Sequence, residues 1–187
     1  MKILGIAGSL RRDSYNAKLL RAAEELLPAV AELEVWDGLK SVPPYDEDDD
    51  VEPAPAPVAE LRAAIAGADA VLFATPEYNS SIPGQLKNAL DWVSRPLISN
   101  PLRNKPVAVI GASTGAFGAV WSQAELRKVL GATGARVVDV EVAVGHAPTR
   151  FDEVGRLVDE DVRLQLQETV DTLLAETPAG LLAAAAV

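Results

Sequence analysis

The chain has no cysteine and a single histidine, His146, among its 187 residues. The missing cysteines exclude disulfides, thiolate metal sites, CxxC redox centres and cysteine nucleophiles. One histidine excludes multi-histidine metal sites and leaves little room for a Ser-His-Asp triad. His146 follows the last expected strand, away from the inferred ligand site, and we interpret it as a structural or surface residue. Any redox chemistry therefore has to rely on a bound cofactor.

Long apolar runs and positive charge are also scarce. No stretch is long enough to span a bilayer, and the start, MKILGIAGS, is too short for a signal peptide. The 17 basic and 27 acidic side chains give a net charge of −10, which disfavours nucleic acids and anionic membranes as partners. We therefore expect no nucleic-acid partner, no membrane partner and, by default, a cytoplasmic protein.

The composition is that of an ordinary globular chain. Apolar residues make up 49% of the sequence and charged residues 24%, and the length suits one domain. We expect that domain over residues 1–178 and a frayed tail over 179–187. The acidic run at 46–52 is followed by alternating proline and alanine, which is typical of a polar, extended surface loop. Its spacing does not fit a calcium-binding loop.

Short apolar runs alternate with helix-periodic segments along the chain. The expected strands lie at 3–7, 33–36, 70–74, 107–110 and 137–144. The expected helices are one that Ser14 caps and that ends near Pro28, and others at 58–66, 85–93, 122–130 and 159–174. This alternation predicts an α/β fold, a three-layer doubly wound sandwich. Five strands favour the flavodoxin-like parallel sheet of order 2-1-3-4-5.

In such a sheet, ligands bind beyond the carboxyl ends of the strands, where the strand order reverses. The loop after the first strand supplies hydroxyls, an amide, a guanidinium and the first N–H groups of a helix, all of which favour an anion. Its candidate residues are Ser9, Arg11, Ser14, Tyr15 and Asn16. An ordinary capped helix with solvated arginines remains the alternative. The loop lacks both GxGxxG and GxxxxGK[ST], which argues against a dinucleotide fingerprint and a P-loop.

Two further loops would face the same cleft. The loop after the third strand is stiffened by proline at both ends and could lie against a planar heteroaromatic ligand. The loop after the fourth strand has small residues, which let a ligand approach the backbone closely. Helix capping by Ser80 or Ser81 and a flexible glycine turn are the alternatives. The convergence of three loops on one cleft favours binding. The candidates in these two loops are Pro76, Glu77, Tyr78, Asn79, Ser113, Thr114 and Gly115.

Three segments resemble the NADPH-dependent FMN reductase family, which includes flavodoxin-like quinone, chromate and azo-dye reductases. They are GSLRRDSYN at 8–16, TPEYNSSIPGQLKNALDWVSRP at 75–96 and ASTGAFG at 112–118, within a resemblance that spans about residues 2–174. The resemblance implies that the FMN phosphate is held by Ser9, Arg11, Ser14 and Asn16. It implies that the isoalloxazine ring is lined, largely by backbone groups, by Pro76, Glu77, Tyr78 and Asn79. Ser113 and Gly115, with Thr114, would close the other side. Ala119 departs from the family pattern, in which many members have glycine.

The resemblance also implies an activity. An FMN-dependent oxidoreductase would transfer a hydride from NADPH or NADH through FMN to a small acceptor such as a quinone, chromate, an azo compound or free flavin. No side chain is then required as a nucleophile or general base, and a homodimer or homotetramer is expected. The alternative is a flavodoxin-type electron carrier that does not oxidise NAD(P)H directly. A phosphorylated receiver domain is excluded because Gly8-Ser9 and Thr75-Pro76 stand where that class needs acidic residues.

Overall fold

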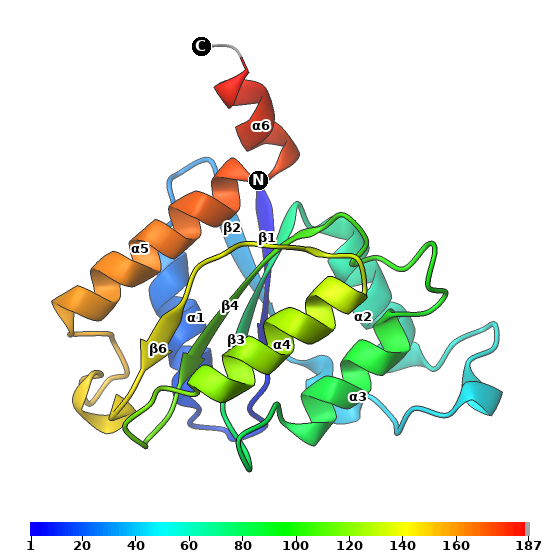
Figure 1. Ribbon diagram of the computed structural model, residues 1–187, viewed down its shortest axis with the longest axis horizontal. Coiled ribbons are helices and arrows are strands. Elements are labelled where there is room, and N and C mark those ends of the chain that lie inside the picture. The colour runs from blue at the N-terminus through cyan, green and yellow to red at the C-terminus, as the bar shows by residue number, and fades with distance from the viewer. Residues whose placement is uncertain (186–187) are drawn as a thin grey trace.

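The apolar runs at 3–7, 70–74 and 107–110 form strands that are largely buried on both faces, as residues of a central parallel sheet must be. The computed structural model describes residues 1–185, and Figure 1 shows the sheet between two layers of helices. Its strands are β1 (Lys2–Ala7), β2 (Glu32–Trp36), β3 (Ala70–Thr75), β4 (Pro106–Ala112), β5 (Arg136–Val137) and β6 (Val142–Val144). Its α-helices are α1 (Tyr15–Glu25), α2 (Ala56–Gly67), α3 (Gly84–Val93), α4 (Val120–Ala132), α5 (Glu160–Ala175) and α6 (Pro178–Ala184). Short 3₁₀ helices are η1 (Gly38–Ser41), η2 (Glu47–Asp49) and η3 (Ala147–Thr149).

The strand order is β2-β1-β3-β4-β5, with β6 also paired to β4, and every pairing is parallel. This order confirms the expected flavodoxin-like, doubly wound fold. All residues of β3 and β4 are buried. The order reverses between β1 and β3, so the loops that follow these strands and β4 meet at one edge, the lower edge in Figure 1.

The fifth strand differs from its expected form. We expected one strand over 137–144, but β5 and β6 are two short strands separated by residues 138–141. The polar residues of this segment explain the break. The Arg127 guanidinium, from α4, donates to the carbonyl of Val140 at 3.3 Å and to the carboxylate of Glu141 at 2.9 Å. Val138 still bonds to β4, and the residues at the end of the segment are held by a helix side chain instead.

The helices cover the two faces of the sheet separately. One core packs α1 and α5 against the sheet, with Leu19, Leu20 and Leu166 fully buried. The other packs α2, α3 and α4 against the opposite face. Trp92 is fully buried there, and its indole N–H donates to the carbonyl of Pro43 at 2.9 Å. The five expected helices are confirmed, and each boundary lies within about three residues of its expected place.

Two surface segments are more ordered than the sequence suggested. Residues 179–184 are helical, because Thr177 caps α6 by accepting a hydrogen bond from the N–H of Gly180 at 3.2 Å. The expected frayed tail is therefore wrong for these residues, and residues 186–187 lie outside those described. The acidic run is not simply extended, since it contains η2 and an ion pair of 2.9 Å between Asp50 and Arg62. None of the helices within residues 1–185 combines the length and the apolar character needed to cross a membrane.

Candidate active site

A cavity of about 130 Å³ opens where the loops after β1, β3 and β4 converge. Ten of the twelve candidate residues line it, all but Asn79 and Gly115. The lining consists of Ser9, Arg11, Ser14, Tyr15, Asn16, Pro76, Glu77, Tyr78, Ala112, Ser113 and Thr114. The fold thus brings together segments that lie about 100 residues apart in the sequence.

A second cavity adjoins the first. The first is smaller than the roughly 300–1,000 Å³ that is typical of cofactor sites. The second, of about 340 Å³, shares Arg11 and Tyr78 with it and continues over Leu10 and Pro83. A ligand larger than one phosphate group would therefore extend from the first cavity over its rim.

The start of α1 provides hydrogen-bond donors. Ser14 has the extended backbone of a helix cap, and its hydroxyl accepts from the N–H of Ala17 at 3.4 Å. The helix leaves the N–H groups of Tyr15 and Asn16 without an intrahelical partner, beside the positive end of the helix dipole. The Arg11 side chain is exposed at the same cavity. This end of the cavity therefore suits an anion.

An ion pair next to this end limits its negative charge. The ammonium group of Lys18 lies 2.6 Å from the carboxylate of Asp13 and 4.9 Å from the centre of the Tyr15 ring. The hydrogen bond and charge of Lys18 lower the pKa of Asp13 below its ordinary value of 3.8. Lys18 thus offsets the charge of Asp13. Arg11 is the basic residue among those that line the cavity.

The side chain of Asn16 has a different place from the expected one. It is buried, its amide N–H donates to the carbonyl of Ala112 at 3.0 Å, and its amide oxygen accepts from the N–H of Ala112 at 2.9 Å. Ala112 lies one residue beyond the last pair between β3 and β4, so β3 offers its backbone no partner. The Asn16 amide takes that role with its oxygen and one of its two N–H groups, so the side chain bridges α1 and β4.

Asn79 serves the turn rather than the cavity wall. Tyr78 and Ser81 exchange two backbone hydrogen bonds of 3.1 Å, and the residues between them have φ of 54° and 59°. This is a type I′ turn, which asparagine tolerates well in its first central position. Both backbone groups of Tyr78 are therefore engaged, whereas the residue as a whole is 49% exposed.

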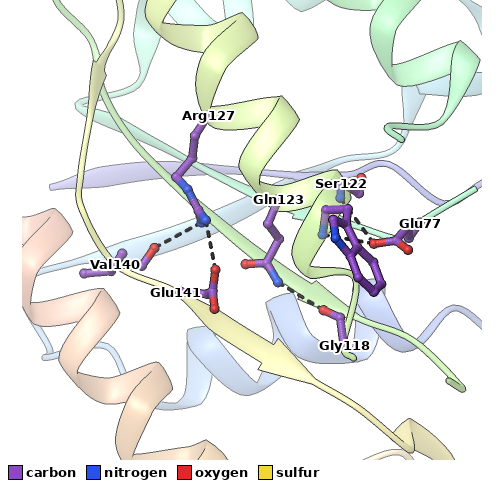
Figure 2. Close-up of polar contacts among 8 residues, drawn as sticks. Glu77, Gly118, Ser122, Gln123, Arg127, Val140 and Glu141 are labelled. Atoms are coloured by element: carbon purple, nitrogen blue, oxygen red, sulfur yellow. Dashed lines mark hydrogen bonds and ion pairs between the residues drawn. The ribbon is translucent and has the colours of Figure 1, made fainter. Parts of the chain in front are cut away.

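Glu77 connects the loop after β3 to helix α4. One oxygen of its carboxylate accepts from the N–H groups of Trp121 at 3.1 Å and of Ser122 at 3.2 Å, as Figure 2 shows. The helix has no cap of its own, because its first residue is preceded by Ala119 at φ 64°. This left-handed conformation favours glycine, which is consistent with the glycine that the resemblance implies at this position.

The loop after β4 is anchored to the segment after β6. The N–H of Ser113 donates to the carbonyl of Val144, and the N–H of His146 donates to the carbonyl of Gly115 at 2.8 Å. Gly118 has φ 59°, and a Cβ atom there would lie 2.3 Å from the backbone of Ala143. The backbone of the loop is therefore tied to β6 and to the segment that follows it, whereas residues 114–117 are exposed. The side chain of His146 is exposed as expected, but its backbone lies next to the site and not away from it.

Two contributors to this site could not have been identified by the sequence patterns. Ala112 lines the cavity, and Ser122 lies behind it, fully buried. The partners of Ser122 are 46 and 47 positions away, so no local motif marks it. Within residues 1–185, no group of three or more histidine, cysteine, aspartate or glutamate side chains is arranged to hold a metal ion.

Comparison with known proteins gives a consistent result. The NADPH-dependent FMN reductase family model matches residues 1–149. The chain is 42% identical to an NAD(P)H-dependent FMN reductase of Pseudomonas aeruginosa over 174 residues, which cover 92% of this chain and 93% of the relative. It is 39% identical to a 2-hydroxy-1,4-benzoquinone reductase of Burkholderia sp. over 176 residues, 94% of this chain and 95% of the relative.

A solved structure agrees with these relatives. FerB, a flavoenzyme NAD(P)H:(acceptor) oxidoreductase from Paracoccus denitrificans, aligns with a TM-score of 0.81 and 35% identity, over 92% of this chain and 94% of that one. The chain belongs to the NADPH-dependent FMN reductase family.

Proposed function

We propose that this protein is an FMN-dependent NAD(P)H oxidoreductase that passes electrons to a small acceptor such as a quinone. The observation that carries the proposal is the cavity itself. An end rich in backbone N–H groups and containing Arg11 is followed by an open rim with an exposed aromatic ring, Tyr78. FMN has a phosphate group at one end and a planar ring system at the other, which match the anion-binding end and the aromatic rim of the cavity. The names of the relatives, FMN reductase and quinone reductase, support the same activity.

The donors at the start of α1 fit a phosphate group. The N–H groups of Tyr15 and Asn16 and the guanidinium of Arg11 would bind its oxygens, while Ser9 and Ser14 offer hydroxyls. The overall charge of −10 does not prevent this, because the local donors and the helix dipole act at contact distance. The side chain of Asn16 would support this end of the cavity by holding Ala112 rather than by touching the phosphate.

The loops after β3 and β4 would hold the ring. Pro76, Glu77 and Tyr78 would face it from one side and Ser113 and Thr114 from the other. Bound FMN supplies the hydride and electron chemistry, so the protein has to bind, orient and shield it. This division of roles is consistent with a chain that has no cysteine and one histidine.

An absorption spectrum of the purified protein tests the proposal directly. We expect flavin bands that persist through gel filtration, or that appear after addition of FMN. We also expect steady-state oxidation of NADPH or NADH with a quinone and no added reductase. A protein that takes up no FMN would contradict the proposal. A protein that binds FMN but needs a separate reductase would instead be a flavodoxin-type carrier.

We further propose a cytoplasmic homo-oligomer, a dimer or a tetramer, built from one domain over residues 1–178. The exposed apolar side chains of Phe117 and Trp121 beside the rim support a subunit contact near the site. Light scattering should give a mass of at least twice the 19.7 kDa of one chain. A mass of one chain would contradict the oligomer and leave the proposed activity unaffected.

A further inference from the structure

The first turn of α4 forms hydrogen bonds to the loop after β3, on the side of the loop that faces away from the cavity. Ser122 is fully buried and does not line the cavity. Its hydroxyl donates to the carbonyl of Pro76 at 2.9 Å and lies 3.0 Å from the hydroxyl of Thr75. The Thr75 hydroxyl also donates to the Pro76 carbonyl, at 2.8 Å. Two hydroxyl groups thus hold one carbonyl of the candidate ring-binding loop.

The hydrogen bonds to the Pro76 carbonyl fix the orientation of the N–H group of Glu77. The carbonyl of Pro76 and the N–H of Glu77 belong to the same peptide unit, which is trans, since the cis peptides of residues 1–185 are at Pro53 and Pro96. In a trans unit the C=O and N–H bonds point in opposite directions. Because the carbonyl points to Ser122, the N–H of Glu77 points away from α4.

The side chain of Glu77 provides a second connection between this peptide unit and α4. Its carboxylate binds the N–H groups of Trp121 and Ser122, where Ala119 provides no side-chain cap (Figure 2). The carboxylate and the Pro76 carbonyl therefore both face α4. Among the backbone groups of this peptide unit, the N–H of Glu77 is the one left for a ligand.

We propose that Ser122 and the Glu77 carboxylate are positioning residues, which turn the N–H of Glu77 toward the cavity as a donor to the bound cofactor. The proposal rests on the proposed function, because it concerns the FMN site. Neither group touches the ligand. Ser122 acts through the Pro76 carbonyl, and the Glu77 carboxylate acts through the first turn of α4. The donor is a neutral backbone group, and so the effect of the carboxylate does not depend on its charge reaching the cofactor.

The variant Ser122→Ala tests the role of the hydroxyl, and Thr133→Val is its matched control. Thr133 is a buried hydroxyl at the other end of the same helix, where it donates to the carbonyl of Leu130 at 2.7 Å. Thr133→Val loses one buried hydrogen bond, and Ser122→Ala loses the bond to Pro76 and the contact with Thr75, so we expect both variants to have a lower Tm. The Kd for FMN should rise about three- to tenfold for Ser122→Ala, the range expected for one weakened hydrogen bond, and stay within twofold for Thr133→Val. Equal effects of the two variants on FMN binding, or none, would overturn the proposal.

The pair Glu77→Ala and Glu77→Gln tests the carboxylate. Glutamine keeps an oxygen that can accept from both N–H groups of α4, whereas alanine removes it. We expect Glu77→Ala to raise the Kd for FMN about tenfold or more and Glu77→Gln to restore it to within threefold of the wild type. A glutamine variant as weak as the alanine variant would show that the negative charge, and not the cap, is required.

Amide hydrogen exchange of the protein without FMN separates this proposal from the proposed function. The N–H groups of Trp121 and Ser122 should be protected in the wild type and in Glu77→Gln, and exposed to exchange in Glu77→Ala. Fast exchange of these amides in the wild type would overturn the capping contact. If the wild type shows protection but no uptake of FMN, the proposed function fails, and with it the assignment of the donor to FMN.

Discussion

The amide of Asn16 gives the sharpest test of how this site is built. Its two hydrogen bonds to Ala112 join the start of α1 to the end of β4, and both residues are buried. Replacing Asn16 with alanine removes both bonds and leaves the N–H and carbonyl of Ala112 unpaired. One hydrogen bond contributes about 0.5–1.5 kcal/mol, and an unpaired buried group adds a penalty, so the expected loss is roughly 2–4 kcal/mol.

Thermal unfolding of the protein without cofactor measures this loss. About 1 kcal/mol shifts the Tm of a chain of this size by roughly 2–4 °C, so the Tm of Asn16→Ala should fall by about 5–15 °C. Asn88→Ala is the control, because the Asn88 amide also bridges backbone groups, of Tyr45 and Pro43, at 2.7 and 2.8 Å. Asn88 does not line the cavity and is only partly buried, so its variant should lose less stability and keep its affinity for FMN.

The opposite outcome would refute this reasoning. If the Asn16 amide were a phosphate ligand, Asn16→Ala without FMN would melt within about 1 °C of the wild type and would lose FMN affinity alone. The variant Asn16→Asp adds a second check. Its carboxylate can accept from the N–H of Ala112 but presents an oxygen to the carbonyl, so it should regain only part of the stability.

Three other predictions follow from the structure. Arg11→Ala should weaken FMN binding by about 1.5–3 kcal/mol, as measured by calorimetry. Arg12 is exposed and lies outside the cavity, so Arg12→Ala should leave FMN binding unchanged. An Arg11→Ala protein with wild-type affinity would exclude Arg11 as a phosphate ligand. Gly118→Ala should destabilise the fold by at least about 2 kcal/mol in urea unfolding, because Gly118 has φ 59° and an added Cβ would meet the backbone of Ala143. Gly131 lies in a helix with open space around it, so Gly131→Ala should stabilise the fold by about 0.5–1 kcal/mol. The pKa of Asp159 is lowered from 3.8, first by the hydrogen bond that its carboxylate accepts from the N–H of Val162. The stability that Asp159 contributes is therefore present above pH 3.8 and is lost as the pH falls through the lower pKa of the folded state. The Tm of Asp159→Asn should decline less between about pH 5 and pH 2.5 than the Tm of the wild type.

The sheet could be predicted from the sequence because burial on both faces leaves a direct signal. The runs that became β1, β3 and β4 are continuous and apolar, and few other structures accommodate them. The run at 137–144 carried a weaker signal. Asp139 and Glu141 interrupt it, and the contact of Arg127 that separates β5 from β6 comes from another helix. Such a contact has no counterpart in local periodicity.

The site could be predicted as a set of loops but not as a set of contacts. Ser14 was identified as a helix cap because its partner is three residues away. Asn16, Glu77 and Ser122 bond to partners 44 to 96 positions away, so their roles depend on tertiary packing. Asn79 was placed at the ring by resemblance, whereas its backbone forms the turn that shapes the loop. Residue types thus predicted which loops meet at the cavity, but not which contacts each side chain makes.

A common principle connects these contacts. Three polar side chains at or behind the cavity, those of Asn16, Glu77 and Ser122, bond to the protein, and backbone N–H groups beside them are left for a ligand. Substitutions other than proline leave a backbone N–H in place, and its direction is set by the element that carries it. Substitutions that impair cofactor binding should therefore occur as often among buried polar residues behind the cavity as among the residues that line it. Arg11 is the exception, because its charge faces the cavity from an exposed side chain and is not required for the fold.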